Sequence, residues 1–318
     1  MKKPMIWSYF IQLSMHMWNE PDSAPKYLYL PVYNENNDTD VATWDKTIKF
    51  VAEHKYNMVV IDVGDGIKYE SHPEISAPDA WDKDFFKKKL DEMRALGLEP
   101  IPKLNFSACH LAWMKEYRRM ISTPIFYKVC ADVIKEVAEL FGYPRLFHLG
   151  MDEENLSLQA TLPMVTIRQF DLLWHDMNFL FAEVEKHGAR PWVWSDQYWD
   201  NPEGFVKNMS KSVLQSNWYY NIFAPKQKSE YNRTAIQAYV DLNELGFEQV
   251  PTVSTCFRAN GRNTLQTLAF AKDKLDPELV KGFLTVPWTA TTPDQELALK
   301  NDAYALYFAR QKYYPETL

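Results

Sequence analysis

The sequence is poor in the residues on which metal-bound and disulfide-bonded proteins depend. Its 318 residues include three cysteines, Cys109, Cys130 and Cys256, an odd number at wide spacing. This arrangement gives neither a disulfide framework nor a paired metal motif, so we expect buried free thiols. There is no HxH or HExxH pattern, and the stretch "DVGDG" at 62–66 lacks the further oxygen ligands of a calcium loop. We therefore expect no bound metal.

The sequence also lacks basic clusters, long apolar runs and glycine-rich loops. Its 35 Lys and Arg against 42 Asp and Glu give a net charge of -7, with no zinc-finger spacing, so nucleic acid is not an expected partner. No stretch offers the ~20 apolar residues of a membrane span, so no membrane partner is expected. Neither GxGxxG nor GxxxxGK follows any apolar run, and no GxSxG elbow is present, which excludes the usual nucleotide cofactors and serine hydrolases.

The N-terminal stretch "MKKPMIWSYFIQ" indicates a first strand, because no small-residue cleavage site follows it. A signal peptide removed beforehand would leave no trace. The compartment stays open between cytoplasmic and periplasmic or secreted, and so does the oligomeric state.

Short apolar strands alternate with longer amphipathic segments along the whole chain, as in βα units around a parallel sheet. Eight strands are predicted, at 5–12, 57–64, 98–105, 145–151, 191–196, 212–218, 251–257 and 282–288. Clear helical patterns cover 40–54, 82–97, 124–142, 165–188 and 294–314. No linker rich in Pro, Gly or Ser divides the chain. We predict an α/β fold, a (β/α)8 TIM barrel, with residues 1–318 forming a single domain.

Carboxylates, amides and aromatic rings follow the predicted strands. In such barrels the chemistry lies at the carboxyl ends of the strands, so these side chains should converge on one rim. They are Asp62 and Asp65 after the second strand, Asn105 and His110 after the third, Asp152 and Glu153 after the fourth, Trp194, Asp196 and Trp199 after the fifth, Trp218, Tyr219 and Tyr220 after the sixth, and Trp288 after the eighth.

Three consecutive carboxylates, Asp152, Glu153 and Glu154, follow the strand "FHLG". Two acids a few ångströms apart cannot both ionise cheaply, so one pKa should rise, and a Glu with a raised pKa is a general acid. We predict that Asp152 and Glu153 are catalytic, with Glu153 as the acid, and that Glu154 is a solvated or helix-capping residue. His148 is interpreted as an orienting group behind the pair.

Aromatic residues are abundant, with 11 Trp, 18 Tyr and 18 Phe. Most are expected in the core, but Trp194, Trp218 and Trp288 each close a strand. Flat apolar faces with polar edges suit sugar rings, so a carbohydrate is the expected partner.

The stretch "FHLGMDEE" resembles the H-x-G-G-D-E strand-end motif of family 20 glycoside hydrolases, the β-N-acetylhexosaminidases, with Met151 at the second glycine. "LGLEPIPKLNFSACH" is similar to the third strand and loop of that family. "PWVWSDQYW", "VLQSNW" and "GFLTVPWTA" resemble the strands that carry its tryptophans.

The resemblance implies a retaining exo-glycosidase in which the acetamido oxygen of the sugar is the nucleophile. Glu153 would then be the acid and base, and Asp152 would orient the acetamido group. The remaining residues would bind the substrate: Asn105, His110, His148, Trp194, Asp196, Trp218, Tyr219 and Trp288, with Asp65 as an additional candidate. Tyr219 would replace the tyrosine that the family carries on its seventh strand.

Two alternatives remain open at this stage. In one, Asp196 or Asp62 is a protein nucleophile acting on a sugar without an acetamido group. In the other, the chain binds carbohydrate without catalysis, because the first-strand arginine and last-strand glutamate of the family are missing here.

Overall fold

The computed structural model of the chain describes residues 4–14, 36–160, 166–223, 227, 229–255 and 262–318. Eight parallel strands form one sheet in the order β6-β5-β4-β3-β2-β1-β8-β7. The strands are β1 (Ile6–Gln12), β2 (Met58–Asp62), β3 (Glu99–Lys103), β4 (Leu146–His148), β5 (Arg190–Trp194), β6 (Leu214–Ser216), β7 (Thr252–Val253) and β8 (Gly282–Thr285). All eight predicted strands are confirmed, each shorter than its apolar run.

Hydrogen bonds between β6 and β7 close the sheet into a barrel. The backbone N–H of Gln215 donates to Glu248 O, that of Val250 donates to Gln215 O, and that of Thr252 donates to Asn217 O. Bridges at Gln215 and at Trp218 lie on the same seam. These contacts join the two ends of the sheet in the described part of the chain, and the predicted (β/α)8 barrel is confirmed.

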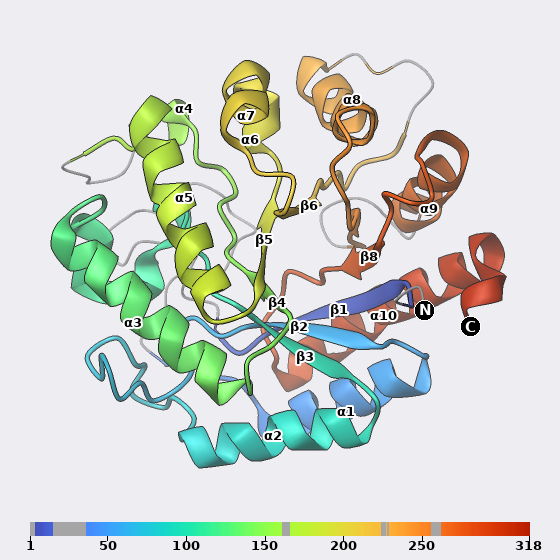
Figure 1. Cartoon of the computed structure of the whole chain (residues 1–318). Helices are drawn as coiled ribbons and strands as arrows, with labels where there is room; N and C mark the ends of the chain where they lie inside the picture. The colour runs from blue at the N-terminus through green and yellow to red at the C-terminus, as the bar shows by residue number, and fades with distance from the viewer. Residues whose placement is uncertain (1–3, 15–35, 161–165, 224–226, 228, 256–261) are drawn as a thin grey trace.

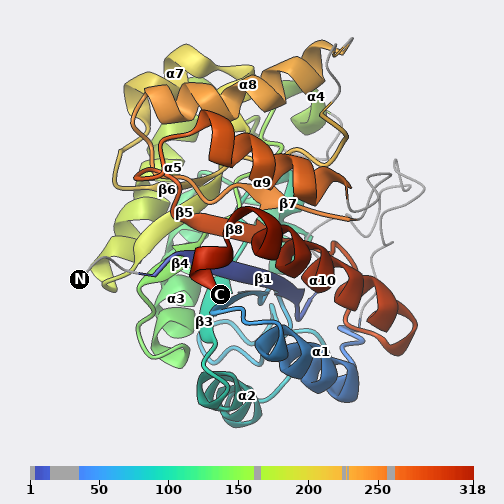
Figure 2. The same ribbon diagram turned by 90° about the vertical axis from the view of Figure 1, so that its right-hand side faces the viewer.

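Helices surround the strands, as Figures 1 and 2 show. The longer ones are α1 (Val41–Glu53), α2 (Lys83–Ala95), α3 (Pro124–Leu140), α5 (Phe170–Lys186), α8 (Glu230–Glu244), α9 (Arg262–Lys274) and α10 (Glu296–Tyr313). Short helices α4 (Leu156–Gln159), α6 (Gln197–Asp200) and α7 (Pro202–Asn208) lie in the connections after β4 and β5. The 3-10 segments are η1 (Ala108–His110), η2 (Ala112–Arg119), η3 (Pro293–Gln295) and η4 (Pro315–Thr317).

Side chains alternate along each strand between two hydrophobic clusters. In β1, Trp7, Tyr9 and Ile11 pack in the large cluster between strands and helices, whereas Ile6 and Phe10 belong to a smaller cluster inside the barrel. Ile101 of β3 and other residues from the remaining strands complete that inner cluster. The inner residues of each strand therefore lead, at the carboxyl end, into one shared site.

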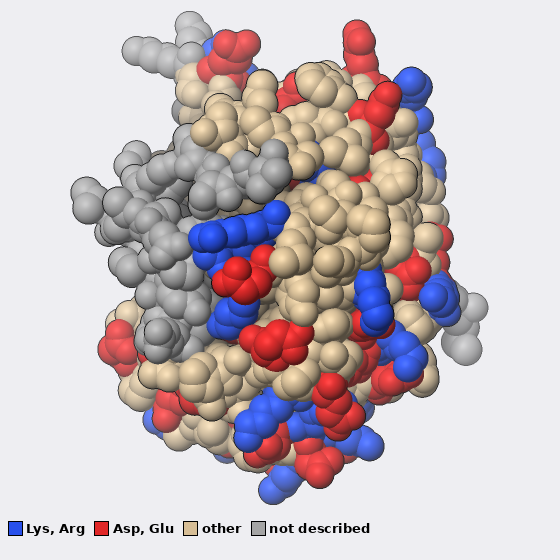
Figure 3. Space-filling view, turned by 90° about the vertical axis from the view of Figure 1, so that its left-hand side faces the viewer, with Lys and Arg blue, Asp and Glu red and all other residues tan. Residues whose placement is uncertain are grey.

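Surface charges are of both signs. Figure 3 shows Lys and Arg side chains intermixed with Asp and Glu on the face drawn. Many form ion pairs, such as Lys68 with Asp82 at 2.9 Å and Lys46 with Glu296 at 3.1 Å. Among the described residues, no helix combines the length and apolar character needed to cross a bilayer.

The thiol predictions hold for part of the chain. Cys130 is buried and free, and Cys109 is free and partly buried. Cys256 lies outside the described residues.

Gly282 lies where the backbone of β8 runs close to that of β1. A Cβ on Gly282 would lie 1.9 Å from Ile6 O, so a side chain here cannot coexist with the β1–β8 pairing. We expect Gly282→Ala to lower the free energy of unfolding by about 1–3 kcal/mol, the usual cost of overpacking.

Gly188 provides the matched control, because a Cβ there meets nothing within 4 Å and only its positive φ of 79° is unfavourable. Gly188→Ala should therefore cost less, about 1 kcal/mol. Urea denaturation of both variants measures the difference, and equal losses would contradict the close approach.

Candidate active site

The turn after β4 places its residues through an unusual backbone conformation. Gly150, Met151 and Glu153 all have positive φ, at 69°, 71° and 58°. A Cβ on Gly150 would lie 2.1 Å from Asn105 Oδ1, so glycine is required for this contact. Non-glycine residues with positive φ cost free energy and often occur at functional sites.

Asp152 is buried at this turn, with 8% of its surface exposed. Asn105 Nδ2 donates to its Oδ1 at 2.7 Å, and His110 Nε2 lies 3.2 Å from its Oδ2. Burial alone would raise the pKa of Asp152, but the His110 charge outweighs it, aided by Lys103, and holds the pKa well below its usual value. Asp152 is therefore ionised at neutral pH.

Glu153 turns toward the mouth of the barrel, and 43% of its side chain is exposed. His110 Nε2 lies 3.3 Å from Glu153 Oε2, so one nitrogen faces both predicted catalytic acids. Burial alone would lower the pKa of His110, but Asp152 and then Glu153 outweigh it and raise the pKa to about 10. A protonated imidazole thus lies close to both side chains.

Asp196 supports the same turn from β5. Its Oδ2 accepts the Glu153 backbone N–H at 2.7 Å, and its Oδ1 accepts Trp218 Nε1–H at 3.2 Å. Burial, followed by the charge of Asp152, raises the pKa of Asp196 well above its usual value. Burial raises the pKa of Asp62 in the same barrel interior as well.

The sequence analysis predicted that Glu154 is solvated or caps a helix, and this prediction was wrong. Its side chain is fully buried against Arg168, which donates from Nε at 2.9 Å and from Nη2 at 3.0 Å. The cap of α4 is Asn155. Arg168 also donates to Phe106 O at 2.6 Å, so this pair joins the β4 turn to the β3 loop.

The same pair explains why α5 is shorter than predicted. Amphipathic periodicity continues back to residue 165, but the helix begins at Phe170. Arg168 turns inward to meet Glu154 and lies 3.4 Å from Asp176. A tertiary ion pair therefore overrides the local pattern.

Below the acid pair lies a row of inward-facing polar residues on four adjacent strands. Gln12 pairs in register with Asp62, Asp62 with Lys103, and Lys103 with His148. Lys103 is fully buried and donates to Asp62 Oδ2 at 2.7 Å. Gln12, which the sequence analysis missed, is 1% exposed and its amide has no hydrogen-bond partner among the described residues.

His148 lies in this row and packs against two tryptophans in tilted contacts. Its ring centroid is 4.4 Å from Trp194 and 5.0 Å from Trp192. Burial, with the Lys103 charge, lowers its pKa well below the usual value, so the ring is neutral. Nδ1 accepts Gly150 N–H at 3.0 Å, which ties His148 to the turn that carries the acids.

The three strand-closing tryptophans lie at one end of the barrel interior. Trp194 belongs to the inner cluster, and Trp288 packs against it with ring centroids 5.9 Å apart. Trp218 stacks on Tyr220 at 5.3 Å and also packs against the inner cluster. These rings form an aromatic wall beside Asp196 and the acid pair.

Tyr219 does not join this wall. It is buried in the outer cluster, its hydroxyl donates to Ile222 O at 3.2 Å, and its ring packs on Phe223. Alternation along the strand end instead turns Tyr220 inward beside Trp218. Side chains alternate between the two faces of a strand, so Tyr220 could have been preferred over Tyr219 as the partner of Trp218 from the sequence alone.

Asp65 is buried in a separate hydrogen-bonded group. Ser14 Oγ donates to its Oδ1 at 2.5 Å and Lys115 Nζ donates to its Oδ2 at 2.7 Å. The structure therefore gives Asp65 partners of its own, from the ends of β1 and from η2. In the described ranges, no cluster of three or more His, Cys, Asp or Glu side chains could hold a metal ion.

The His110 geometry predicts a pH dependence of stability. The raised pKa means that the folded protein keeps a proton which the unfolded chain loses above about pH 6.5, so this contribution decreases as the pH rises toward 10. We expect the free energy of unfolding of wild type to fall more steeply from pH 7 to 10 than that of His110→Asn, by at most about 1.4 kcal/mol per pH unit. Denaturant titrations across this range measure it, and parallel curves would contradict the ion pairs.

The Glu154–Arg168 pair predicts a large effect on stability. Glu154→Gln keeps the shape of the side chain but leaves a buried guanidinium without its main counterion, which should cost about 3–5 kcal/mol. The matched control Glu296→Gln removes a carboxylate from surface ion pairs with Lys46 and Lys300 and should leave the unfolding midpoint near wild type. Equal midpoints for the two variants would show that the buried pair is not needed.

Comparisons with known proteins show the fold. No protein-family model matches the sequence, and no curated protein matches it. An exo-β-N-acetylglucosaminidase of family 20 from Vibrio harveyi has a TM-score of 0.60 at 12% identity, over 99% of this chain and 58% of that one. The β-N-acetylhexosaminidase of Streptomyces coelicolor A3(2) has 0.63 at 14% identity, over 94% and 63%.

An N-acetyl-β-hexosaminidase of Streptomyces plicatus, in complex with Thio-NAglucal, has a TM-score of 0.63 at 14% identity, over 98% of this chain and 68% of that one. The chain thus spans 58% to 68% of these three enzymes. At such low identity the likeness concerns the fold. The chain therefore has the same barrel fold as these three enzymes.

Proposed function

We propose that the protein is a glycoside hydrolase, a retaining exo-β-N-acetylhexosaminidase that uses substrate assistance. One observation carries the proposal: Asp152 and Glu153 lie at the carboxyl end of β4, bridged by one His110 nitrogen at 3.2 and 3.3 Å, beside an aromatic wall. The fold shared with family 20 enzymes supports it.

In the first step Glu153 donates a proton to the leaving glycosidic oxygen while the acetamido oxygen of the sugar attacks the anomeric carbon. An oxazolinium-like intermediate forms, and the aglycone leaves. In the second step Glu153 removes a proton from water, which adds to the anomeric carbon and releases the sugar with retained configuration. The exposed half of Glu153 suits a group that must meet both the leaving oxygen and water.

Asp152 serves as the fixed anion. Its lowered pKa keeps it ionised, so it accepts the acetamido N–H and stabilises the positive charge that develops on the acetamido group. The hydrogen bond from Asn105 holds one oxygen in place. His110 Nε2 lies 3.2 Å from Asp152 and 3.3 Å from Glu153, and this contact holds the two side chains in place.

The floor of the barrel binds the sugar hydroxyls. Gln12 supplies an amide donor and acceptor that no described residue satisfies, and a buried amide without partners costs about 1–3 kcal/mol per group. Trp194 Nε1, also buried and without a partner among the described residues, offers a second donor. These groups take the place of the arginine that the first strand lacks.

A protein nucleophile is less well supported. Both oxygens of Asp196 accept hydrogen bonds from the site itself, and its raised pKa opposes the ionised form that a nucleophile needs. Asp62 is held by Lys103 in the barrel interior. Neither carboxylate is available for attack on a sugar.

Replacing the proposed acid tests the function. Glu153→Gln keeps the size of the side chain but cannot donate or accept the proton, so we expect kcat for 4-nitrophenyl N-acetyl-β-D-glucosaminide to fall about 10²- to 10⁴-fold. Its unfolding midpoint should match wild type, because the side chain is half exposed. Release of nitrophenol and a urea titration measure the two quantities.

Undiminished turnover by Glu153→Gln would contradict the proposal that Glu153 is the general acid. A 4-nitrophenyl β-D-glucoside, which has no acetamido group, is the matched control substrate. Turnover of the glucoside with covalent labelling of a carboxylate by a 2-fluoro glycoside would instead establish a protein nucleophile.

A further inference from the structure

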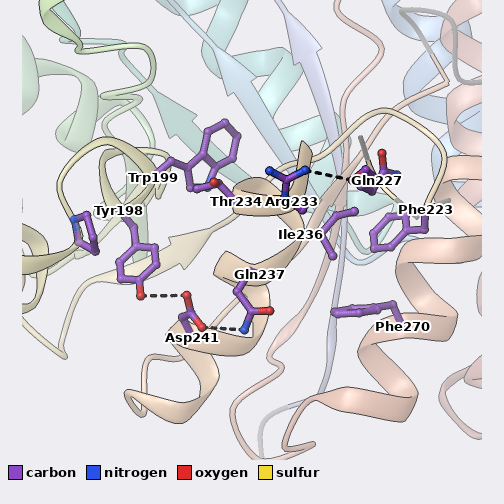
Figure 4. A pocket seen from close by; sticks show the side chains of 11 residues that line it. Tyr198, Trp199, Phe223, Gln227, Arg233, Thr234, Ile236, Gln237, Asp241 and Phe270 are labelled. Atoms are coloured by element: carbon purple, nitrogen blue, oxygen red, sulfur yellow. Dashed lines mark hydrogen bonds between the residues drawn. The ribbon is translucent and has the colours of Figure 1, made fainter. Parts of the chain in front are cut away.

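A hollow lies on the outside of the barrel, on the side of β5 and β6. It has a volume of about 750 Å³, within the range of small-molecule sites. Its lining comes from α6, from Pro202 at the start of α7, from the connection between β6 and α8, from α8 and from α9, as Figure 4 shows. Because α6 follows β5 directly, the α6 side of this hollow lies near the carboxyl end of β5.

Aromatic rings flank the hollow. Tyr198 and Trp199 of α6 lie along one flank of α8, and Phe223 and Phe270 lie along the other (Figure 4). All four are partly exposed, so each offers part of its ring to the hollow.

Polar side chains from α8 lie between these rings and are already ordered. Tyr198 OH donates to Asp241 Oδ2 at 3.0 Å, and Gln237 Nε2 donates to Asp241 Oδ1 at 2.8 Å. Arg233 Nη1 donates to Gln227 O at 3.1 Å. Burial, then Asp241, raises the pKa of Tyr198 to about 12, so its hydroxyl stays neutral. Preorganised groups reduce the entropy lost on binding.

The charged groups in the lining indicate which class of ligand the hollow would bind. Both oxygens of Asp241 accept hydrogen bonds from the lining itself, and Arg233 is exposed at the rim. A cation would meet a single carboxylate, Asp241, and the nearby Arg233 charge among the described lining residues. A neutral ligand with an apolar face and many hydroxyls or amides fits both the rings and the amide and guanidinium groups.

Trp199 connects the hollow with the candidate active site. Its ring lies 4.6 Å from that of Trp218, whose Nε1 donates to Asp196. Trp199 Nε1 donates to Asn217 Oδ1 at 2.9 Å, which fixes the ring. The two sites therefore share one aromatic partition.

From this geometry we infer that the hollow around α8 is a second carbohydrate-binding site, which holds a distal unit of a saccharide chain by stacking on its rings and by hydrogen bonds to Gln237 and Arg233. The inference rests on the proposed function only in taking the substrate to be a saccharide. It makes the protein a binder of oligosaccharides as well as of the terminal sugar.

Arg233→Ala combined with Gln237→Ala removes the polar contacts from exposed positions and leaves the Tyr198–Asp241 hydrogen bond in place. Calorimetric titration in the Glu153→Gln background, with chitohexaose and separately with cellohexaose, measures binding without turnover. We expect the double variant to weaken binding of at least one hexasaccharide about tenfold. The matched control is Lys207→Ala, which removes an exposed cation of α7 that does not line the hollow.

With Glu153 intact, the double variant should hydrolyse the nitrophenyl monosaccharide within about twofold of wild type, because the substitutions lie away from the acid pair. Unchanged binding of both hexasaccharides, or an equal loss with Lys207→Ala, would overturn the second site. A tenfold loss of monosaccharide turnover in the double variant would also overturn the second site, because the two residues would then act on the active site.

The two proposals fail in different ways. Failure of the hydrolase leaves wild type inactive on every glycoside, whereas the titrations still report the second site. A loss of cellohexaose binding in the double variant would support the site even if no N-acetylhexosaminide is cleaved.

Discussion

Three consecutive carboxylates can share one turn only because the backbone directs them into three environments. Asp152 is buried beside Asn105 and His110, Glu153 reaches the mouth, and Glu154 is buried against Arg168. Positive φ values at Met151 and Glu153 make this sorting possible, since a regular strand or helix would crowd the charges on fewer faces. The strain of the turn is offset by the partners that each acid gains.

The proton distribution follows from that sorting. Asp152 stays ionised because His110 is protonated. The pKa of the nearby Asp196 is raised because Asp196 is buried and lies close to the anionic Asp152. Separate pKa values for neighbouring groups are what acid–base chemistry near neutral pH requires. The sequence analysis placed His110 in the loop after the third strand but did not predict its contact with Asp152 and Glu153. Sequence order gives no distance between residues 110 and 153.

The fold could be predicted from the sequence because each strand has its own apolar run and each connection its own amphipathic pattern. Asp152, Glu153 and the three tryptophans were located because strand ends converge in a barrel. Glu154 was misjudged because its partner Arg168 lies in what looks like an exposed helix, and the cost of burying that arginine is met only by a tertiary contact. Tyr219 was misjudged because one residue of register separates the inner face from the outer face.

Gln12 shows a different limit of sequence reasoning. A single glutamine in an apolar strand carries no motif, yet the register places it beside Asp62 and Lys103 at the floor of the site. Its neutral amide lies inside the barrel, and the buried positive charge beside it comes from Lys103 of β3. The cation at the floor is therefore already paired with Asp62, and the sugar would meet an uncharged donor and acceptor. Such a floor discriminates by the positions of hydroxyl groups more than by charge, because a missing hydroxyl would leave a buried amide unsatisfied.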